Sequence, residues 1–474
     1  MGFVIYNSLG RQKQPFQPIE EGKVRMYNCG PTVYSRAHIG NLRSFLFADL
    51  LRRWLEHLGY EVTQVMNITD VGHLVADEEE GEDKIEAQAK RTGQDPWQIA
   101  REHEAQFHAD LEALGVRKAS LYPRATDHIP EMLEMIDGLI EKDFAYQVNG
   151  NVYFDVSRFE RYGRLSGNRV EDLDAGARIE INKEKRHPAD FALWKDDPAH
   201  LMKWKSQFGD DGFPGWHIEC SAMARKHLGD RIDIHTGGED NVFPHHECEI
   251  AQSESFTGEA FANYWMHAKF LQVDGGKMSK SLGNVYSVQD VIDRGFEPRV
   301  LRYTLLRGHY RQQLNFTWDI MADSKKALSN LDRLYEKLVA VAAGEGGAPE
   351  PAAGRELLQT ARDEFEAGMN DDLNVPRGLA AVFSLRSEVN EDHLGRDVAT
   401  EAVAFLDSVN DVLAVISTER EVGSDDAEID ALVTARKQAR EDKDWAASDR
   451  IRDELDARGI LVEDAAAGTT WRRK

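Results

Sequence analysis

Two short motifs contain residue types that bind and stabilise phosphate groups. His38-Ile-Gly-Asn41 stands where a loop gives way to a helical pattern, and Lys277-Met-Ser-Lys-Ser281 lies in a glycine-flanked loop. An imidazole, an amide and backbone N–H groups at a helix start attract an anion, and Gly40 admits a flat base. Lys277 and Lys280 can stabilise charge on a departing pyrophosphate. The two motifs therefore predict a site that binds and cleaves ATP.

Either motif alone has an ordinary explanation. A histidine can simply begin a helix, and a lysine-rich loop is usually only solvated. It is their occurrence together, in this order along one chain, that favours a shared role in nucleotide chemistry.

Four residues with metal-binding side chains form a candidate zinc site: Cys29, Cys220, His245 and Glu249. His245 and Glu249 are four residues apart, so a helix places both on one face, and the cysteines add soft, anionic donors. The ligand set is open at this point, because His246 and Cys248 could each replace a ligand. The competing interpretation is a closed structural zinc site, or no metal at all.

The segments around these motifs are typical of a β–α–β unit. Residues 24–28 and 62–68 read as strands, and apolar residues recur at helical spacing from Phe45 to Leu58. Such a unit predicts a parallel sheet with its ligand site at the carboxyl ends of the strands. We therefore expect an α/β fold with a Rossmann-like catalytic core.

The catalytic domain is predicted at 1–320, with an insertion at about 97–215. The insertion begins with helical patterns that continue to residue 143, and residues 151–156 look like a strand. After Asn284 the chain becomes mainly helical, and Ser287 to Asp290 resembles a helix start.

Two further domains are predicted in the C-terminal third. Amphipathic stretches at 321–341 indicate a helical bundle domain at 321–418, interrupted by an Ala/Gly/Pro-rich loop at 342–354. A polar linker at 419–427 then leads to a small module at 428–474.

Composition bounds the class of protein. With 474 residues, 41% hydrophobic and 30% charged, the chain is expected to form several globular domains. Three cysteines do not make a disulfide framework, and neither a signal sequence nor a membrane span is recognisable, so we expect a cytoplasmic protein. The net charge of -25 opposes a polyanion at long range, so any RNA contact must be local.

Several longer segments resemble the cysteinyl-tRNA synthetases, a family of class I aminoacyl-tRNA synthetases. They are Tyr27 to Tyr34, Asn67 to Asp70, Gly215 to Cys220, Phe243 to Gln252, the lysine motif and Gly468 to Lys474. The sequence departs from the class signature at Asn41, where a second histidine is expected. An amide can still donate a hydrogen bond, so we expect activity to survive this change.

The resemblance implies roles for individual residues. It selects His245 over His246 as the zinc ligand and leaves Cys248 as an extra thiol without a role. Its further assignments are Gly238 and Asp240 at the ATP ribose, Thr32, Trp216 and His235 in the cysteine pocket, and Arg440 and Asp449 at the tRNA anticodon.

The resemblance implies activation of L-cysteine with ATP and Mg²⁺, followed by transfer to tRNA-Cys, by a protein that we expect to be a monomer. Cysteine and serine differ by one atom, whereas accurate translation needs a preference of about 10⁴–10⁵. Zinc can supply this preference, because it lowers the pKa of a thiol and binds the thiolate, whereas an alcohol stays protonated. We see no general base for the transfer step.

Three other functions stay open. A cysteine ligase that acts on an amino sugar would share the core but should lack the C-terminal module, and a nucleotidyltransferase would not need the metal ligands. A synthetase-like RNA-binding or scaffold protein without activity would suit Asn41 and the acidic composition. The intact lysine motif and the four metal-binding residues argue against this last interpretation.

Overall fold

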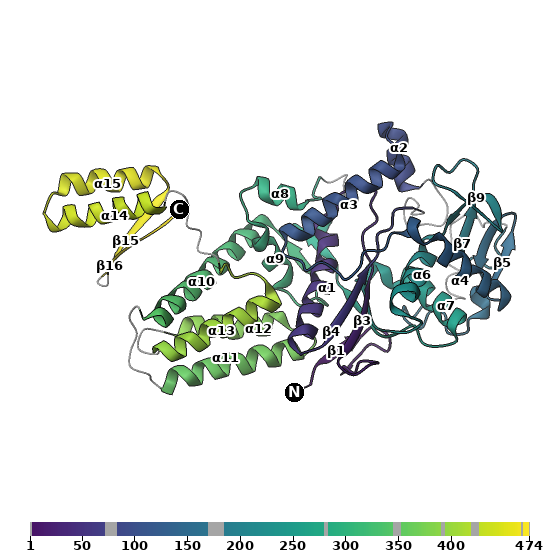
Figure 1. Cartoon of the computed structure of the whole chain (residues 1–474), viewed down its shortest axis with the longest axis horizontal. Coiled ribbons are helices and arrows are strands. Elements are labelled where there is room, and N and C mark those ends of the chain that lie inside the picture. The colour runs from purple at the N-terminus through teal and green to yellow at the C-terminus, as the bar shows by residue number, and fades with distance from the viewer. Residues whose placement is uncertain are drawn as a thin grey trace. The chain divides into compact units, whose positions relative to one another are not determined.

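A parallel sheet of four strands joins the segments that the sequence analysis singled out. Its order is β11-β10-β3-β4, with β3 at Lys23–Asn28, β4 at Glu61–Met66, β10 at Ile232–Gly238 and β11 at Ala262–Ala268. Helix α1 (Ile39–His57) connects β3 to β4, as predicted (Figure 1). The α/β fold with a parallel core is thereby confirmed. The loops that follow β3 and β10 lie at one edge of the sheet.

The computed structural model describes residues 2–71, 83–168, 184–278, 283–344, 352–389, 394–418, 426–465 and 468–473. They cluster into two units, Met1–Ile416 and Ser417–Lys474, which we describe separately. No helix among these residues has the length and apolar character that crossing a membrane requires.

Helix α1 is held by burial along most of its length. Its apolar side chains, among them Leu42, Leu46, Leu51 and Trp54, are excluded from solvent. The chain reverses at Gly59, whose φ of 89° lies in the left-handed region that favours glycine. A buried helix of this kind fixes the position of its own N-terminus, where His38 stands.

The insertion combines helices with an antiparallel sheet. Helix α2 (Lys84–Thr92) comes just before the predicted start of the insertion, and its own helices are α3 (Pro96–Ala113) and α4 (Ile129–Glu141), with short 3-10 turns at Ala125–His128 and Val156–Arg158. Its sheet has the order β5-β6-β7-β9-β8, with strands at Ala145–Val148, Asn151–Phe154, Phe191–Asp196, Gly209–Pro214 and Trp204–Ser206. The helical start and the strand near residue 151 are confirmed, whereas the other four strands were not predicted.

Two further helices bring residues to the edge of the parallel sheet. They are α6 (Trp216–Leu228) and α7 (His245–Thr257), and the short 3-10 turn η4 (Glu239–Val242) follows β10. A two-stranded sheet of β1 (Val4–Asn7) and β2 (Gln12–Pro15) lies near the N-terminus.

The lysine motif begins on a small sheet. Strand β12 (Leu271–Val273) pairs in parallel with β14 (Leu314–Phe316) and antiparallel with β13 (Gly276–Lys277). Helices α8 (Val288–Asp293) and α9 (Pro298–Leu306) follow, and Ser287 caps α8 in a capping box with Asp290, as predicted.

A helical bundle completes the larger unit. Its helices are α10 (Trp318–Ala343), α11 (Ala352–Asn370), α12 (Val375–Glu388) and α13 (Arg396–Leu413) (Figure 1). The predicted loop at 342–354 is wrong at both ends, because α10 continues to Ala343 and α11 begins at Ala352. Residues 345–351 lie outside the described residues.

The smaller unit has its own core. Helices α14 (Asp426–Glu441) and α15 (Trp445–Ala457) precede a hairpin of β15 (Ile460–Ala465) and β16 (Gly468–Arg473). Ile429, Val433, Leu455 and Ile460 are buried together. Most of the predicted linker, residues 419–425, lies outside the described residues.

Candidate active site

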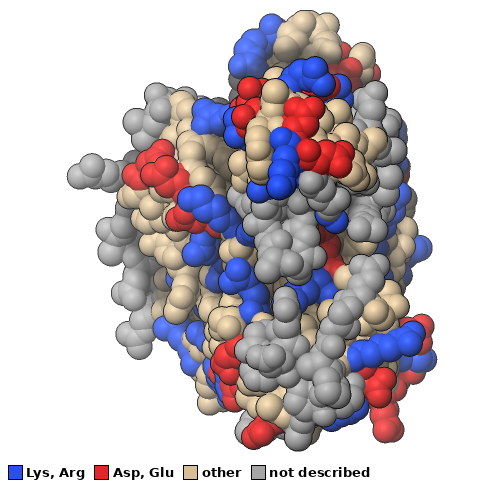
Figure 2. Space-filling model, turned by 90° about the vertical axis from the view of Figure 1, so that its left-hand side faces the viewer, with Lys and Arg blue, Asp and Glu red and all other residues tan. Residues whose placement is uncertain are grey.

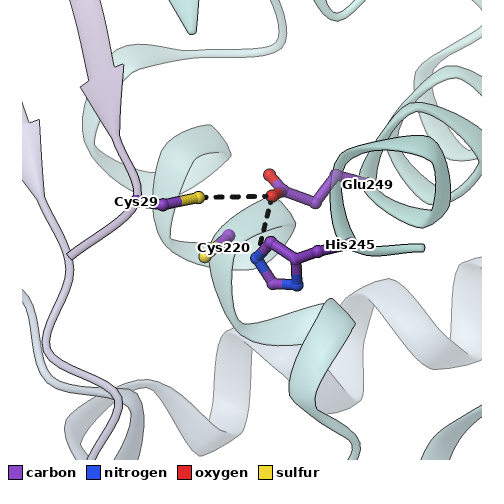
Figure 3. Close-up of side chains that lie close together, drawn as sticks. All are labelled: Cys29, Cys220, His245 and Glu249. Atoms are coloured by element: carbon purple, nitrogen blue, oxygen red, sulfur yellow. Dashed lines mark hydrogen bonds and ion pairs between the residues drawn. The ribbon is translucent and has the colours of Figure 1, made fainter. Parts of the chain in front are cut away.

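The four predicted metal-binding side chains converge near the carboxyl end of strand β3 (Figure 3). Cys29 follows β3 directly, Cys220 lies in α6, and His245 and Glu249 lie on one face of α7. One donor atom from each lies within 4.8 Å of the other three. The His245 Nε2 and Glu249 Oε1 atoms are 3.1 Å apart, and the Cys29 Sγ is 3.8 Å from the same oxygen. The spacing of four residues on α7 therefore places both ligands as the sequence predicted.

Neighbouring backbone fixes Cys29 at the end of its strand. The Cys29 N–H donates to the carbonyl of Thr236 in β10 at 3.0 Å, and the Gly30 N–H donates to Asn67 Oδ1 at 2.8 Å. A Cβ at position 30 would overlap the carbonyl of Asn67. Only glycine therefore lets the chain turn here without displacing Cys29.

A second set of donors overlaps the first. Cys29, His235, His246 and Glu249 also lie within 4.8 Å of one another. The Cys29 Sγ is 3.0 Å from His246 Nε2, and His235 Nε2 is 2.8 Å from Glu249 Oε2. The first set contains two sulfur atoms and the second only one, so the chemistry of the donors favours the first set for zinc.

Charges within the first set compensate one another. Burial opposes charge on Glu249, but His235 and His245 lower the pKa of its carboxyl to about 2. Burial also opposes charge on His245, but the carboxylate of Glu249 and the thiolate of Cys220 raise the pKa of its imidazole to about 10.

The two cysteines form a coupled pair. Burial raises the pKa of the Cys29 thiol, which donates a hydrogen bond to Cys220. Burial opposes charge on Cys220 as well, but this hydrogen bond and the neighbouring His245 lower its pKa to about 6. Metal binding needs thiolates and a neutral imidazole, so a divalent cation that binds all four side chains would release protons from the cluster.

A cavity of about 380 Å³ opens beside the cluster, and Cys29 belongs to both. Seven of the residues predicted to contact substrates or metal line it: Cys29, Thr32, His38, Asn41, Trp216, Gly238 and Asp240. His235 does not line it, because its ring is fully buried behind Glu249. A contact of His235 with the amino acid stays a prediction.

His38 and Asn41 together cap the N-terminus of α1. The Asn41 N–H donates to His38 Nδ1 at 3.2 Å, and the His38 N–H donates to Asn41 Oδ1 at 3.3 Å. A capping box needs an acceptor at the third helical position, and an amide supplies one. The asparagine that replaces the expected histidine thus has a structural role.

The two motifs that are predicted to bind phosphate meet at the cavity. A Cβ at position 40 would overlap the end of the Met278 side chain, so Gly40 admits the lysine motif to the start of α1. Lys277 is exposed at the end of β13, and Asn284 donates to its carbonyl at 3.2 Å. Lys280 lies outside the described residues.

Trp216 forms the wall between the cavity and the metal-binding cluster. It begins α6 and lines the cavity, and its indole stacks on the ring of His245, with ring centroids 4.3 Å apart. Trp216 therefore contacts both the cavity and a member of the metal-binding cluster.

Several residues that line the cavity were not predicted from the sequence. Lys84 at the start of α2 and His103 on α3 both line it, and the Lys84 Nζ lies 5.2 Å from the centre of the Tyr34 ring. No motif marks Lys84 or His103, whereas Tyr34 lies within a segment that the resemblance covered. The insertion therefore contributes to the site in addition to the β–α–β core.

Residues predicted to contact the anticodon lie in the smaller unit. Arg440 is in the last turn of α14, and Asp449 on α15 forms an exposed ion pair with Arg452 at 3.1 Å. Their contact with RNA stays a prediction.

Three family models match successive parts of the chain. Residues 15–326 match the class I (C) tRNA synthetase catalytic domain, residues 364–417 the DALR domain, and residues 425–472 the cysteinyl-tRNA ligase anticodon binding domain. The parallel core, the cavity and these matches define a class I aminoacyl-tRNA synthetase.

Relatives that match the chain over its full length identify its family within this class. The chain is 46% identical to the cysteine–tRNA ligase of Symbiobacterium thermophilum, over 100% of both chains. It is 43% identical to that of Chlorobaculum tepidum, over 99% of both, and 41% identical to that of Thermococcus onnurineus, over 100% and 99%. The chain belongs to the cysteine–tRNA ligase family.

A solved structure supports the fold independently. Methionyl-tRNA synthetase of Mycobacterium tuberculosis, in complex with methionyl-adenylate, superposes with a TM-score of 0.62 at 16% identity. The match covers 83% of this chain and 92% of that one.

Proposed function

We propose that the chain is a cysteine–tRNA ligase that activates L-cysteine with ATP and transfers it to the 3′ end of tRNA-Cys. One observation carries the proposal: Cys29 is at once a member of the metal-binding cluster and part of the cavity wall. A substrate in the cavity can therefore reach the cluster.

The cluster suits a zinc ion. Two thiol sulfurs, an imidazole nitrogen and a carboxylate oxygen are typical zinc donors, and the pKa of Cys220, about 6, makes one thiolate available at neutral pH. A bound zinc ion supplies a bond to the substrate thiolate that the hydroxyl of serine does not form. Four protein ligands normally close a zinc site, so Cys29, Cys220, His245 and Glu249 would have to hold the ion in a way that leaves room for the substrate sulfur.

Side chains of the cavity have proposed roles toward ATP. His38 and the N-terminus of α1 stabilise charge on the phosphates, with Mg²⁺ as the usual counterion, and Gly238 and Asp240 hold the ribose. Lys277 is proposed to stabilise the departing pyrophosphate together with Lys280. The cysteine carboxylate attacks the α-phosphorus, so this step needs no protein nucleophile.

The amino acid is proposed to lie between Thr32, Trp216 and the metal-binding cluster. The indole of Trp216 gives the pocket a flat wall, and Thr32 is held next to β4 by a bridge to Thr69. His235 would then act through Glu249, which it contacts at 2.8 Å.

Recognition of tRNA is proposed to involve the smaller unit, with Arg440 and Asp449 at the anticodon. The whole chain has a net charge of -25, which opposes RNA at long range. On the face in Figure 2, however, Lys and Arg side chains lie among the Asp and Glu side chains, so local contacts with phosphate are available. We further propose a monomer that works in the cytoplasm.

Exchange of pyrophosphate into ATP tests the proposal. We expect exchange with L-cysteine, none above background with serine, and cysteinylation of tRNA-Cys when the RNA is added. Exchange without charging would favour the amino-sugar ligase, and no exchange with either amino acid would leave only the non-catalytic interpretation.

A further inference from the structure

Arg43 makes an unusual set of contacts about one turn inside α1. Its side chain is buried, with 3% of the residue exposed. Its Nη1 donates to the carbonyls of Lys269 at 2.6 Å and Phe270 at 2.9 Å. Its Nη2 donates to the carbonyls of Gln312 at 2.6 Å and His309 at 3.2 Å. One guanidinium thus joins two backbone segments that lie more than 220 residues away in sequence.

The two segments are the starting points of paired strands. Phe270 immediately precedes β12, Gln312 lies just before β14, and these strands pair in parallel. β13, which ends at Lys277, pairs with β12. Arg43 therefore fixes the base of the small sheet on which the lysine motif begins.

The same segment is held from a second direction by Glu239. The Phe270 N–H donates to Glu239 Oε1 at 2.8 Å, and the ammonium of Lys269 forms an ion pair with the same carboxylate. Glu239 begins η4, between Gly238 and Asp240. The dipeptide Lys269-Phe270 consequently connects α1, η4 and the lysine sheet.

Two more contacts join α1 to the lysine motif. The Ile39 N–H donates to the carbonyl of Tyr286 at 2.8 Å, and the end of the Met278 side chain lies against Gly40. These contacts hold the start of α1 against Met278 and Tyr286, which lie on either side of residues 279–282. The contacts described above therefore connect three segments of the chain, and one residue of each, His38, Asp240 or Met278, lines the cavity.

We propose that Arg43 is a positioning residue for ATP activation, which holds the start of α1, η4 and the base of the lysine motif in one geometry. The inference rests on the proposed function. A guanidinium has N–H groups pointing in several fixed directions and serves two strands at once, whereas the single ammonium of lysine does not. Small displacements of phosphate-binding groups reduce rates strongly, so loss of this contact should reduce activation without altering the metal-binding cluster.

The test compares Arg43→Lys with a matched control, Arg302→Lys. Arg302 is also fully buried and also donates to backbone carbonyls, those of Leu413 at 2.6 Å and Leu114 at 3.2 Å. It pairs with Asp49 of α1 at 2.6 Å, but none of its described contacts reaches η4 or the small sheet of the lysine motif. Both variants should lower the melting temperature. We expect only Arg43→Lys to raise the KM for ATP and to lower the rate of cysteine-dependent exchange, by about 10- to 100-fold. The KM for cysteine and the zinc content should stay within about twofold of wild type.

A double variant separates positioning from general damage. If Arg43 acts through the lysine motif, Arg43→Lys should cost less than about threefold when Lys277→Ala is already present. Glu239→Ala, a milder change at a partly exposed side chain, should shift the KM for ATP in the same direction and covers the case in which Arg43→Lys does not fold.

Equal exchange kinetics for the Arg43 and Arg302 variants, or full additivity with Lys277→Ala, would overturn the inference. Absence of exchange in the wild-type protein would instead overturn the proposed function. In that event, the ATP affinity of the two variants, measured by calorimetry, still tests Arg43: equal affinities count against its role and a selective loss supports it.

Discussion

The metal-binding cluster and the adjacent cavity both lie at the carboxyl ends of the parallel strands, but they are built differently. Cys220, His245 and Glu249 are at most 1% exposed, and their charges compensate one another within the cluster. In the cavity wall, Asn41 is exposed and bonded to His38, and Lys277, which precedes the lining residue Met278, is exposed without a carboxylate partner among the described contacts. The cluster that we propose to select the amino acid is therefore organised before substrate arrives, whereas the proposed phosphate-binding groups act on a substrate that itself brings the opposite charge.

Removing a ligand should have the largest effect and should separate the two regions. Cys220→Ser is expected to lower zinc affinity by more than about 100-fold. Loss of a residue that only hydrogen-bonds to a metal ligand already costs about 10- to 100-fold, and Cys220 is proposed to be a ligand itself. Cysteine-dependent exchange should disappear, while ATP binding measured by calorimetry is retained. Cys248→Ser is the control, since its buried sulfur contacts Tyr162 and belongs to neither donor set. Unchanged metal content in Cys220→Ser would refute the ligand assignment.

A change in the cavity should give the opposite pattern. His38→Asn keeps a side chain that can cap α1 but removes the imidazole, so we expect the exchange rate to fall about 100-fold with little change in melting temperature. Zinc content should equal that of wild type. His38→Ala should lose activity to the same extent and also stability, and a loss of zinc in His38→Asn would contradict the separation of the two regions.

Deletion of residues 417–474 tests whether the small unit is needed for either region. Because this unit forms a core of its own, we expect pyrophosphate exchange to remain unchanged. The KM for tRNA should rise by at least about tenfold through lost phosphate and base contacts. Arg440→Ala and Asp449→Ala in the full chain should each reproduce part of that rise, and an unaltered KM would remove the anticodon assignment.

The smallest expected effect is on stability and concerns α3, whose residues His103 and Phe107 line the cavity. Burial opposes charge on Glu104 of α3, but hydrogen bonds from His108 and Arg124 lower the pKa of its carboxyl from 4.5 to about 2. A depressed pKa contributes stability above pH 4.5 that is lost as the pH falls toward 2. Glu104→Gln should therefore reduce the melting temperature at neutral pH, on the order of 1–2 °C, and reduce its acid dependence. Equal acid profiles for variant and wild type would exclude this ion pair as a cause.

Much of this arrangement could be predicted from local sequence patterns. The β–α–β unit, the capping box at Ser287 and the shared face of His245 and Glu249 all follow from spacing within a few residues. The choice between His245 and His246 did not follow from spacing, and the structure explains why: each belongs to a set of four donors.

Contacts between distant segments were beyond such reasoning. Lys84 and His103 reach the cavity only because α2 and the insertion pack over it, and neither stands in a recognisable pattern. Arg43 looks like any basic residue in a helix, since the carbonyls that it binds are supplied by segments over 220 residues away. The strands of the insertion were missed because most are short and do not alternate clearly between apolar and polar residues.

The decisive measurement is the preference for cysteine over serine as a function of zinc content. Exchange rates with each amino acid would be compared for the protein as purified, after chelation of metal, and after zinc is restored. The account predicts that chelation abolishes exchange with cysteine and that zinc restores it, with serine near background throughout. A metal-free protein that still prefers cysteine over serine by the same factor would contradict it.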